Sequence, residues 1–417
     1  MARCIAIAGP GLMGLGIAQV AAAGGVGVLL LGRDVASALA GFDRLAASVT
    51  RQVARGRLSR TAADALLAQV RAARHDDALA DCDLAIESVT EDRGTKIAVL
   101  QRLQAALPTG TLIASNTSGL PISGLAAALR RPERFLGLHF FSPVERMPLV
   151  EVVRGAATAQ ASVQEGLAFV RQIGQQPILV RDGPGFFTSR VFAAYLDEAL
   201  AMVGEGVAPA LIEAAGVALG RPLGPLAVLD EISLRLNHQQ ARQALADGLA
   251  PRFCRPLALP VLQRMLALGR GGRREGGGFY EHDAATGRRL WPLLGSVFPV
   301  AAAAPLQLRV QQHEQQRVQQ RLRCAEVMEA LRCLEEGVLD SADDADTGSL
   351  LGLGFPAATG GVLRWAESEG LASFVATCSV LARDYGPRFE ASPWLLVLAA
   401  RGQGLARWRQ KSSIGEC

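Results

Sequence analysis

A glycine-rich string near the start of the chain constrains the fold more than any other feature. The apolar run Cys4–Ala8 reads as a strand, it ends in Gly9-Pro10-Gly11-Leu12-Met13-Gly14, and helical text follows in Leu15–Ala21. In such a G-x-G-x-x-G turn, the first glycine permits the tight turn and the second lets the backbone approach a pyrophosphate. The third lets the helix pack closely on the strand, and the free N–H groups at the helix start favour phosphates. The pattern predicts a dinucleotide site formed by Gly9, Gly11, Leu12, Met13 and Gly14.

Size and composition limit the classes of protein to which the chain can belong. Its 417 residues are too many for one ordinary core, so we expect two or three domains. The formal net charge is only +4, which gives no case for a nucleic-acid partner. We expect no signal peptide, because the chain enters a strand almost at once without a basic region followed by a longer apolar one. We expect no membrane span, because apolar runs such as 394–400 are too short to cross a bilayer.

Cysteine usage bears on two further kinds of site, disulfides and metal sites. The seven cysteines are scattered, form no C-x-x-C pair and are accompanied by only five histidines. This spacing disfavours both a disulfide framework and a zinc site, so we expect no metal. A reducing, cytoplasmic setting is the simplest expectation.

Strand-like and helical stretches alternate over about the first 180 residues. This rhythm is typical of a mostly parallel sheet with helices on both faces. Helices are expected in the gaps, for example over 36–55 and 61–73. Strands are expected over 4–8, 26–31, 84–87, 112–115, 135–140, 150–153 and 177–180.

After Asp182-Gly183-Pro184-Gly185 the sequence pattern is mostly typical of helices. A second boundary follows, in the Gly/Arg-rich stretch 269–278 and the Pro/Ala-rich stretch 291–305. We therefore predict an α/β protein in which a Rossmann-type doubly wound sheet precedes two all-α domains. The predicted segments are a nucleotide-binding domain over 1–182, a helical domain over 183–282, a linker over 283–318 and a second helical domain over 319–410.

The second helical segment repeats the first. Short strings recur in the same order, two of them at one constant offset and the third a few residues out of register, which favours duplication over two unrelated helical hairpins. The pairs are Glu198-Ala199-Leu200 with Glu329-Ala330-Leu331, Glu205-Gly206-Val207 with Glu336-Gly337-Val338, and Leu219-Gly220-Arg221-Pro222 with Leu353-Gly354-Phe355-Pro356.

The end of the second predicted strand carries the residues that would meet the adenosine ribose. A nucleotide fold usually has an acid there, but this strand ends in Gly32-Arg33-Asp34, so glycine holds the strand-end position. Asp34 satisfies the looser spacing of about twenty residues past the glycines, or it caps the next helix. Arg33 can pair with a ribose 2′-phosphate, which would allow NADP beside NAD, or it can stack on the adenine.

A histidine and a glutamate on neighbouring predicted strands form the candidate catalytic pair. His139 lies on an apolar strand, and Glu151 is an acid within the apolar run 149–153. A buried carboxylate needs a partner. A His–Glu pair fixes the imidazole tautomer and raises its basicity, as a general base acting on an alcohol requires. Ser118 follows another strand end and either hydrogen-bonds the same substrate oxygen or caps a helix.

Taken together, the motifs resemble the L-3-hydroxyacyl-CoA dehydrogenases. The resemblance covers nearly the whole chain and is closest to the dehydrogenase half of the fatty-acid β-oxidation multifunctional enzyme, without its hydratase half. It rests on 9–14, Ser115-Asn116-Thr117-Ser118, His139-Phe140-Phe141-Ser142-Pro143, Met147-Pro148-Leu149-Val150-Glu151 and Asp182-Gly183-Pro184-Gly185-Phe186.

The resemblance implies roles for particular residues. His139 matches the catalytic base, Glu151 its partner and Ser118 the serine that touches the substrate oxygen. Residues implied near the cofactor are Glu91, Lys96, Ser118 and Ser142, and those implied near the CoA phosphates, with a solvated helix face as the alternative, are Arg51, Arg55 and Arg57. The chain departs from the family at three positions: Gly32 at the strand end, Ser189 in place of an active-site asparagine, and Gly277 in place of a lysine.

The resemblance thus implies an oxidoreductase that interconverts (S)-3-hydroxyacyl-CoA and 3-oxoacyl-CoA by hydride transfer with NAD, or NADP, in fatty-acid β-oxidation. Two alternatives stay open: a dehydrogenase of another β-hydroxy acid or carrier-bound acyl chain, and a decayed nucleotide-binding scaffold. Because single-copy relatives dimerise through the helical domain, the duplication implies a monomer with an internal pseudo-dimer, or at most a weak homodimer.

Overall fold

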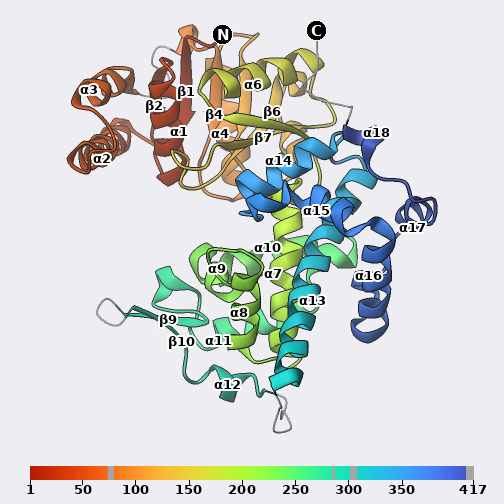
Figure 1. Ribbon diagram of the computed structural model, residues 1–417. Helices are drawn as coiled ribbons and strands as arrows, with labels where there is room; N and C mark the ends of the chain where they lie inside the picture. The colour runs from red at the N-terminus through yellow and green to blue at the C-terminus, as the bar shows by residue number, and fades with distance from the viewer. Residues whose placement is uncertain (74–78, 284–286, 301–307, 410–417) are drawn as a thin grey trace. The chain divides into compact units, whose positions relative to one another are not determined.

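The structure is a computed structural model, and it describes residues 1–73, 79–283, 287–300 and 308–409. The chain divides into two compact units (Figure 1). The first comprises Met1–Phe187 together with Gly337–Gly352, and the second comprises Thr188–Glu336 and Leu353–Arg409.

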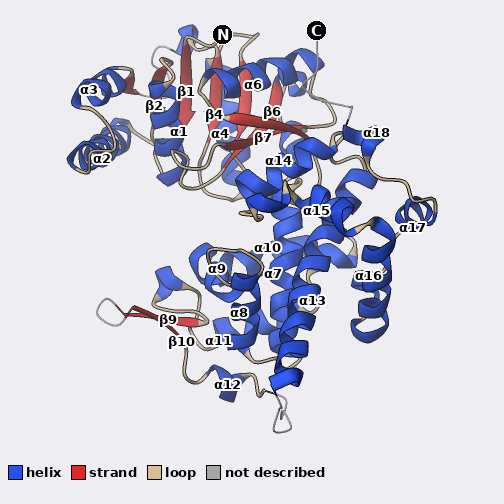
Figure 2. Ribbon diagram, viewed as in Figure 1, coloured by secondary structure: helices blue, strands red, loops and turns tan. Residues whose placement is uncertain are grey.

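One eight-stranded sheet organises the first unit, in the order β3-β2-β1-β4-β5-β6-β7-β8 (Figure 2). The strands from β3 to β6 are parallel, β7 runs antiparallel to β6, and β8 is parallel to β7. The strands are β1 (Cys4–Ala8), β2 (Gly27–Leu31), β3 (Val70–Ala73), β4 (Leu84–Glu87), β5 (Leu112–Ser115), β6 (Phe135–Phe140), β7 (Leu149–Arg154) and β8 (Gln176–Arg181).

The strands are apolar on both faces because helices cover the sheet, as the predicted doubly wound fold requires. The fold class predicted from the sequence is confirmed, and so are the seven predicted strands to within about one residue at each end. The helices of this unit are α1 (Leu12–Ala23), α2 (Val35–Ala54), α3 (Arg60–Ala68), α4 (Arg93–Ala106), α5 (Ile122–Ala126), α6 (Gln160–Gln172) and α14 (Ala342–Gly352), with 3₁₀ turns at Leu79–Asp81 and Pro132–Arg134.

The prediction of one helix over 61–73 is wrong. Helix α3 ends at Ala68, and the next residues form the edge strand β3, which pairs with β2 from Val70 to Ala73. The alanine-rich text carries no strand signal, so only pairing with β2 makes this segment a strand.

Nearly all regular structure in the second unit is helical (Figure 2). It also contains a two-stranded hairpin, β9 (Tyr280–Asp283) and β10 (Gly287–Leu290), that the sequence did not predict. The helices are α7 (Thr188–Gly204), α8 (Pro209–Ala218), α9 (Pro225–Ile232), α10 (Leu234–Ala246), α11 (Ala258–Ala267), α12 (Leu294–Val297), α13 (Leu308–Glu335), α15 (Val362–Glu369), α16 (Leu371–Tyr385), α17 (Pro393–Ala400) and α18 (Ala406–Arg409), with 3₁₀ turns at Pro251–Cys254, Arg273–Glu275, Ala357–Thr359 and Pro387–Phe389.

The segment predicted as a linker, 283–318, is more ordered than expected. It contains β10, α12 and the first turns of α13, while 301–307 lie outside the described residues. The proposed boundaries of the helical domains stay predictions. In the described ranges, none of the helices has both the length and the apolar character that a bilayer crossing requires.

Helix α7 presents a buried arginine to α13. The guanidinium of Arg190, with its side chain 4% exposed, lies 2.5 Å from Glu329 and 2.8 Å from Glu336. Burial alone would lower the pKa of Arg190, but the charges and hydrogen bonds of neighbouring Cys333, Glu336 and Glu329 raise the pKa above its ordinary value. Arg190 is therefore a buried cation held by two carboxylates, without which its burial would be costly.

The same contact recurs with the roles of α7 and α13 exchanged. Arg321 on α13 lies 2.6 Å from both Glu198 on α7 and Glu205 just after it, and its side chain is 2% exposed. Along the chain, Arg321, Glu329 and Glu336 follow Arg190, Glu198 and Glu205 at the same offset at which the sequence repeats. Reciprocal contacts of this kind are typical of an interface between two equivalent copies.

Two short turns add to this symmetry. Both begin with Pro-Arg-Phe, a repeat that our sequence analysis missed. The arginine of the first turn, Arg252, lies 2.8 Å from Glu336, just after α13. That of the second, Arg388, lies 3.2 Å from Glu205, just after α7. We call Arg190, Glu198, Glu205, Arg321, Glu329 and Glu336, with these two arginines, the reciprocal seam.

Candidate active site

The glycine turn between β1 and α1 is shaped as the sequence predicted. Gly9 has a φ of 112°, a conformation that side chains rarely adopt, and its N–H donates to Leu31 O at 3.0 Å. A Cβ on Gly14 would collide with Gly9 O, so only glycine lets the helix begin this close to the turn. A Cβ on Gly11 would meet no described atom within 4 Å, which leaves open space above the turn.

The start of α1 is suited to an anionic group. Within the described residues, Gly11 supplies no side-chain cap, and the first turn of α1 contains no acid. By contrast, α2 and α4 are capped by the carboxylates of Asp34 and Asp92. The unoccupied N–H groups of α1 and the space above Gly11 fit the pyrophosphate of a dinucleotide. Leu12 is exposed in this first turn, whereas Met13 packs partly into the core.

The capping alternative for Asp34 is the one found. Its carboxylate accepts the Ser37 N–H at 2.7 Å, and the Ser37 hydroxyl accepts the Asp34 N–H at 3.2 Å. The backbone and side-chain hydrogen bonds from Ser37, with the nearby charge of Arg33, lower the pKa of Asp34. Asp34 therefore holds the start of α2, and its contact with the cofactor ribose stays a prediction.

The predicted histidine–glutamate pair is present between β6 and β7. His139 and Glu151 are direct partners in the antiparallel register, so their side chains lie on the same face of the sheet. His139 Nδ1 lies 2.6 Å from Glu151 Oε2, with Glu151 fully buried and the histidine side chain 8% exposed. An ionised carboxylate only accepts hydrogen bonds, so Nδ1 carries the proton and Nε2 of the neutral ring is left as an acceptor.

Both members of this pair are held in place by further contacts. The second oxygen of Glu151 accepts the Phe187 N–H at 3.1 Å. The imidazole of His139 lies near two aromatic rings, with centroid distances of 4.5 Å to Phe141 and 5.9 Å to Phe186. The pair is therefore preorganised.

A second network ties the carboxyl ends of β4 and β5 together. Lys96 Nζ lies 2.9 Å from the buried carboxylate of Glu87 and 3.2 Å from Glu91. The same carboxylate of Glu91 accepts Thr117 Oγ1 at 2.5 Å and the Ser118 N–H at 3.0 Å. Glu91, Lys96 and Ser118, all implied in the site by the resemblance, are thus brought together at one edge of the sheet.

This network shows how Lys96 is held and adds two residues. The side chain of Lys96 is only 1% exposed and its ammonium pairs with Glu87 and Glu91, and its implied place near the cofactor stays a prediction. Glu87 and Thr117 were missed. Glu87 ends an apolar strand, the same signal that singled out Glu151, and could have been found in that way.

The remaining candidate residues lie elsewhere. Ser142 is exposed just after β6, and Ser189 lies in the first turn of α7, in the second unit, so its part in the site stays a prediction. The three arginines at the end of α2 are all exposed, and none has an ion-pair partner reported within the described ranges; they are Arg51, Arg55 and Arg57.

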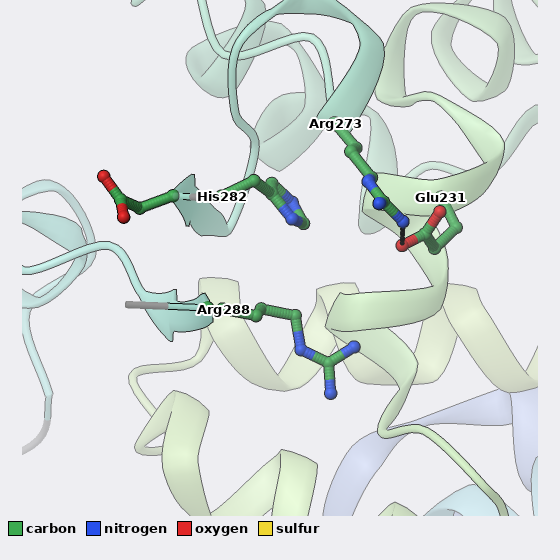
Figure 3. Close-up of a pocket in the computed structure, with 6 residues that line it drawn as sticks. Glu231, Arg273, His282 and Arg288 are labelled. Atoms are coloured by element: carbon green, nitrogen blue, oxygen red, sulfur yellow. Dashed lines mark hydrogen bonds and ion pairs between the residues drawn. The ribbon is translucent and has the colours of Figure 1, made fainter. Parts of the chain in front are cut away.

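A hollow of about 650 Å³ in the second unit contains none of the predicted site residues. Figure 3 shows His282 and Arg288 extending from the two strands of the β9–β10 hairpin, and Arg273 turned toward Glu231, to which it is ion-paired at 2.7 Å. We assign the hollow no part in the chemistry. In the part of the chain that the structure describes, no three His, Cys, Asp or Glu side chains converge to hold a metal.

Comparison with known proteins agrees with this geometry. The family model of the 3-hydroxyacyl-CoA dehydrogenase NAD binding domain matches residues 4–183, and that of the C-terminal domain matches 185–282. The fatty acid oxidation complex subunit alpha of Shewanella frigidimarina is 35% identical over 350 residues, which are 84% of this chain and 48% of that protein. The chain therefore spans about half the length of such curated relatives.

Solved structures extend the similarity to the whole chain. The 3-hydroxybutyryl-CoA dehydrogenase of Escherichia coli K12 superposes with a TM-score of 0.82 at 28% identity, covering 96% of this chain and 99% of that one. The (S)-3-hydroxybutyryl-CoA dehydrogenase of Ralstonia eutropha is 33% identical with a TM-score of 0.64, covering 68% of this chain and all of that one (100%).

Proposed function

Since the chain belongs to the 3-hydroxyacyl-CoA dehydrogenase family of NAD-dependent oxidoreductases, we propose that it interconverts (S)-3-hydroxyacyl-CoA and 3-oxoacyl-CoA. The observation that carries the proposal is the buried hydrogen bond between His139 Nδ1 and Glu151 Oε2 at 2.6 Å. A decayed scaffold would have no reason to retain this preorganised base in the same sheet as a dinucleotide turn.

In the oxidative direction, Nε2 of His139 accepts the proton of the substrate hydroxyl. Glu151 stabilises the imidazolium that forms, because its carboxylate stays hydrogen-bonded to Nδ1. NAD, when bound, supplies the acceptor for the hydride that leaves C3. In the reductive direction, His139 returns the proton to the oxygen. Ser118, fixed through its N–H to Glu91, is proposed to orient that oxygen, with a weaker contribution from Ser189.

Binding of the CoA moiety is proposed at the end of α2. Arg51, Arg55 and Arg57 are exposed cations close together in sequence, and guanidinium groups suit phosphates. A cytoplasmic setting is part of the proposal, and the six free thiols among the described cysteines agree with it.

The function is tested by measuring the loss of NADH absorbance with acetoacetyl-CoA and, separately, with free acetoacetate. We expect turnover with the thioester and much slower turnover with the free acid, because only the thioester reaches the arginines of α2. Preference for the free acid would point to another β-hydroxy acid. Tight NADH binding without turnover of either compound would favour the scaffold.

The reciprocal seam supports a proposal on oligomeric state. An interface between equivalent copies is already made within one chain, by α7 and α13. We propose that the second helical segment takes the place of a partner subunit and that the protein is a monomer. Light scattering at micromolar concentration should give the mass of one chain, 43.9 kDa. A stable dimer under the same conditions would contradict this proposal.

A further inference from the structure

We propose that the adenosine end of the dinucleotide site recognises the 2′-phosphate of NADP(H) through Arg33. This inference rests on the proposed dehydrogenase function, because it concerns which of the two nicotinamide dinucleotides the site prefers. Three features at the end of β2 carry it: the place of the usual acid is closed, the nearest acid is engaged, and an arginine is exposed beside the glycine turn.

The place of the usual acid is sterically closed. In folds that select NAD, an acid at the end of the second strand accepts hydrogen bonds from the ribose hydroxyls. Gly32 holds that position, and a Cβ there would collide with Ser37 Oγ and lie 2.6 Å from Ala38 N and 2.8 Å from Asp34 O. Two of these are backbone atoms around the start of α2, so a carboxylate side chain cannot be placed at Gly32 unless that helix start moves.

The nearest acid is committed to the helix. The Asp34 carboxylate accepts the Ser37 N–H, and the Ser37 hydroxyl lies 2.9 Å from Asp34 O, to which it donates. This reciprocal capping box stabilises the start of α2. Asp34 Oδ1 is taken up by this cap, and Asp34 lies two residues past Gly32, so the strand-end position itself offers no carboxylate to the 2′-hydroxyl of NAD.

Arg33 is exposed at the same edge. Within the described ranges its side chain makes no hydrogen bond or ion pair, and its charge is one of the causes that lower the pKa of neighbouring Asp34. The hydrogen bond from Gly9 N to Leu31 O places the end of β2 directly beside the glycine turn. From the other side, Arg44 of α2 donates to Pro10 O at 2.7 Å, which adds a second cation next to the turn.

These features favour a phosphate over a hydroxyl. A guanidinium binds phosphate oxygens through two parallel hydrogen bonds, and such charge-assisted bonds are about twice as strong as neutral ones. The 2′-hydroxyl of NAD would gain little from Arg33, whereas the 2′-phosphate of NADP would gain a bidentate, oppositely charged partner.

The test uses two probes that lack the nicotinamide ring, ADP-ribose and ADP-ribose 2′-phosphate, titrated calorimetrically into the full-length protein. We expect the 2′-phosphate probe to bind roughly ten- to a hundredfold more tightly. Arg33→Gln should remove this advantage and leave the affinity for ADP-ribose nearly unchanged. The matched control is Arg102→Gln, which removes an exposed arginine of α4 and should preserve the preference.

Each other outcome overturns the inference in a recognisable way. Equal or tighter binding of ADP-ribose by the unmodified protein would refute 2′-phosphate recognition and leave the dehydrogenase proposal standing. An equal loss of affinity for both probes in Arg33→Gln would mean that Arg33 stacks on the adenine. Failure of both probes to bind would remove the dinucleotide site itself, and the proposed function with it.

Discussion

Replacing His139 with alanine is expected to lower kcat for the reduction of acetoacetyl-CoA by roughly 10²- to 10⁴-fold. The imidazole is proposed to move the proton at the substrate oxygen, and a methyl group cannot replace it. NADH affinity should be nearly unchanged, because the glycine turn is formed by other strands. The measurement is steady-state kinetics with a parallel fluorescence titration of NADH.

The control for this variant is His313→Ala, which removes an exposed histidine of α13 and should leave kcat unchanged. If His139→Ala kept most of the activity with intact NADH binding, another residue would have to act as the base. A variant that lost NADH binding as well would indicate a folding defect, and His139→Gln would then repeat the test with a polar side chain of similar size.

Replacing Glu151 with glutamine is expected to lower kcat by about 10²- to 10⁴-fold, as when the carboxylate partner of a catalytic histidine is replaced by an amide. Two N–H donors face this carboxylate, one from His139 and one from Phe187. An amide has only one acceptor oxygen, so one donor must face the NH₂ group. If the His139 N–H is that donor, the imidazole avoids the repulsion by moving its proton from Nδ1 to Nε2. Nε2 can then no longer accept a proton from the substrate.

Glu165→Gln is the control for this second variant, because Glu165 is a more exposed carboxylate whose ion pair with Arg134 lies near the surface. It should leave kcat unchanged, and both variants should bind NADH as the unmodified protein does. Activity of Glu151→Gln close to that of the unmodified protein would mean that the carboxylate neither fixes the tautomer nor stabilises the imidazolium.

Much of the sheet was predictable because its strands are short apolar runs bounded by glycine, asparagine and proline. The His139–Glu151 pair was predictable for a related reason: a carboxylate within an apolar strand requires a buried partner, and the neighbouring strand offered a histidine. Strand β3 was not predictable, since Val70-Arg71-Ala72-Ala73 continues a helical pattern and becomes a strand only through β2.

The ion pairs were harder to foresee than the strands. Arg190 and Arg321 lie on helices that carry several charged residues, and a sequence does not reveal which arginine is buried against which glutamate. The repeat itself was visible in the glutamates, but their partners became evident only from the contact of α7 with α13. The commitment of Lys96 to Glu87 was likewise hidden, because it depends on the packing of α4 against the end of β4.

His139 and Glu151 are proposed to act as one unit, which a double-mutant cycle on kcat with acetoacetyl-CoA would reveal. We expect Glu151→Gln to cause a large loss of kcat in the unmodified protein and almost no further loss once His139 is alanine. If Glu151→Gln lowered kcat by the same factor in both backgrounds, the two side chains would act independently and would not form one catalytic unit.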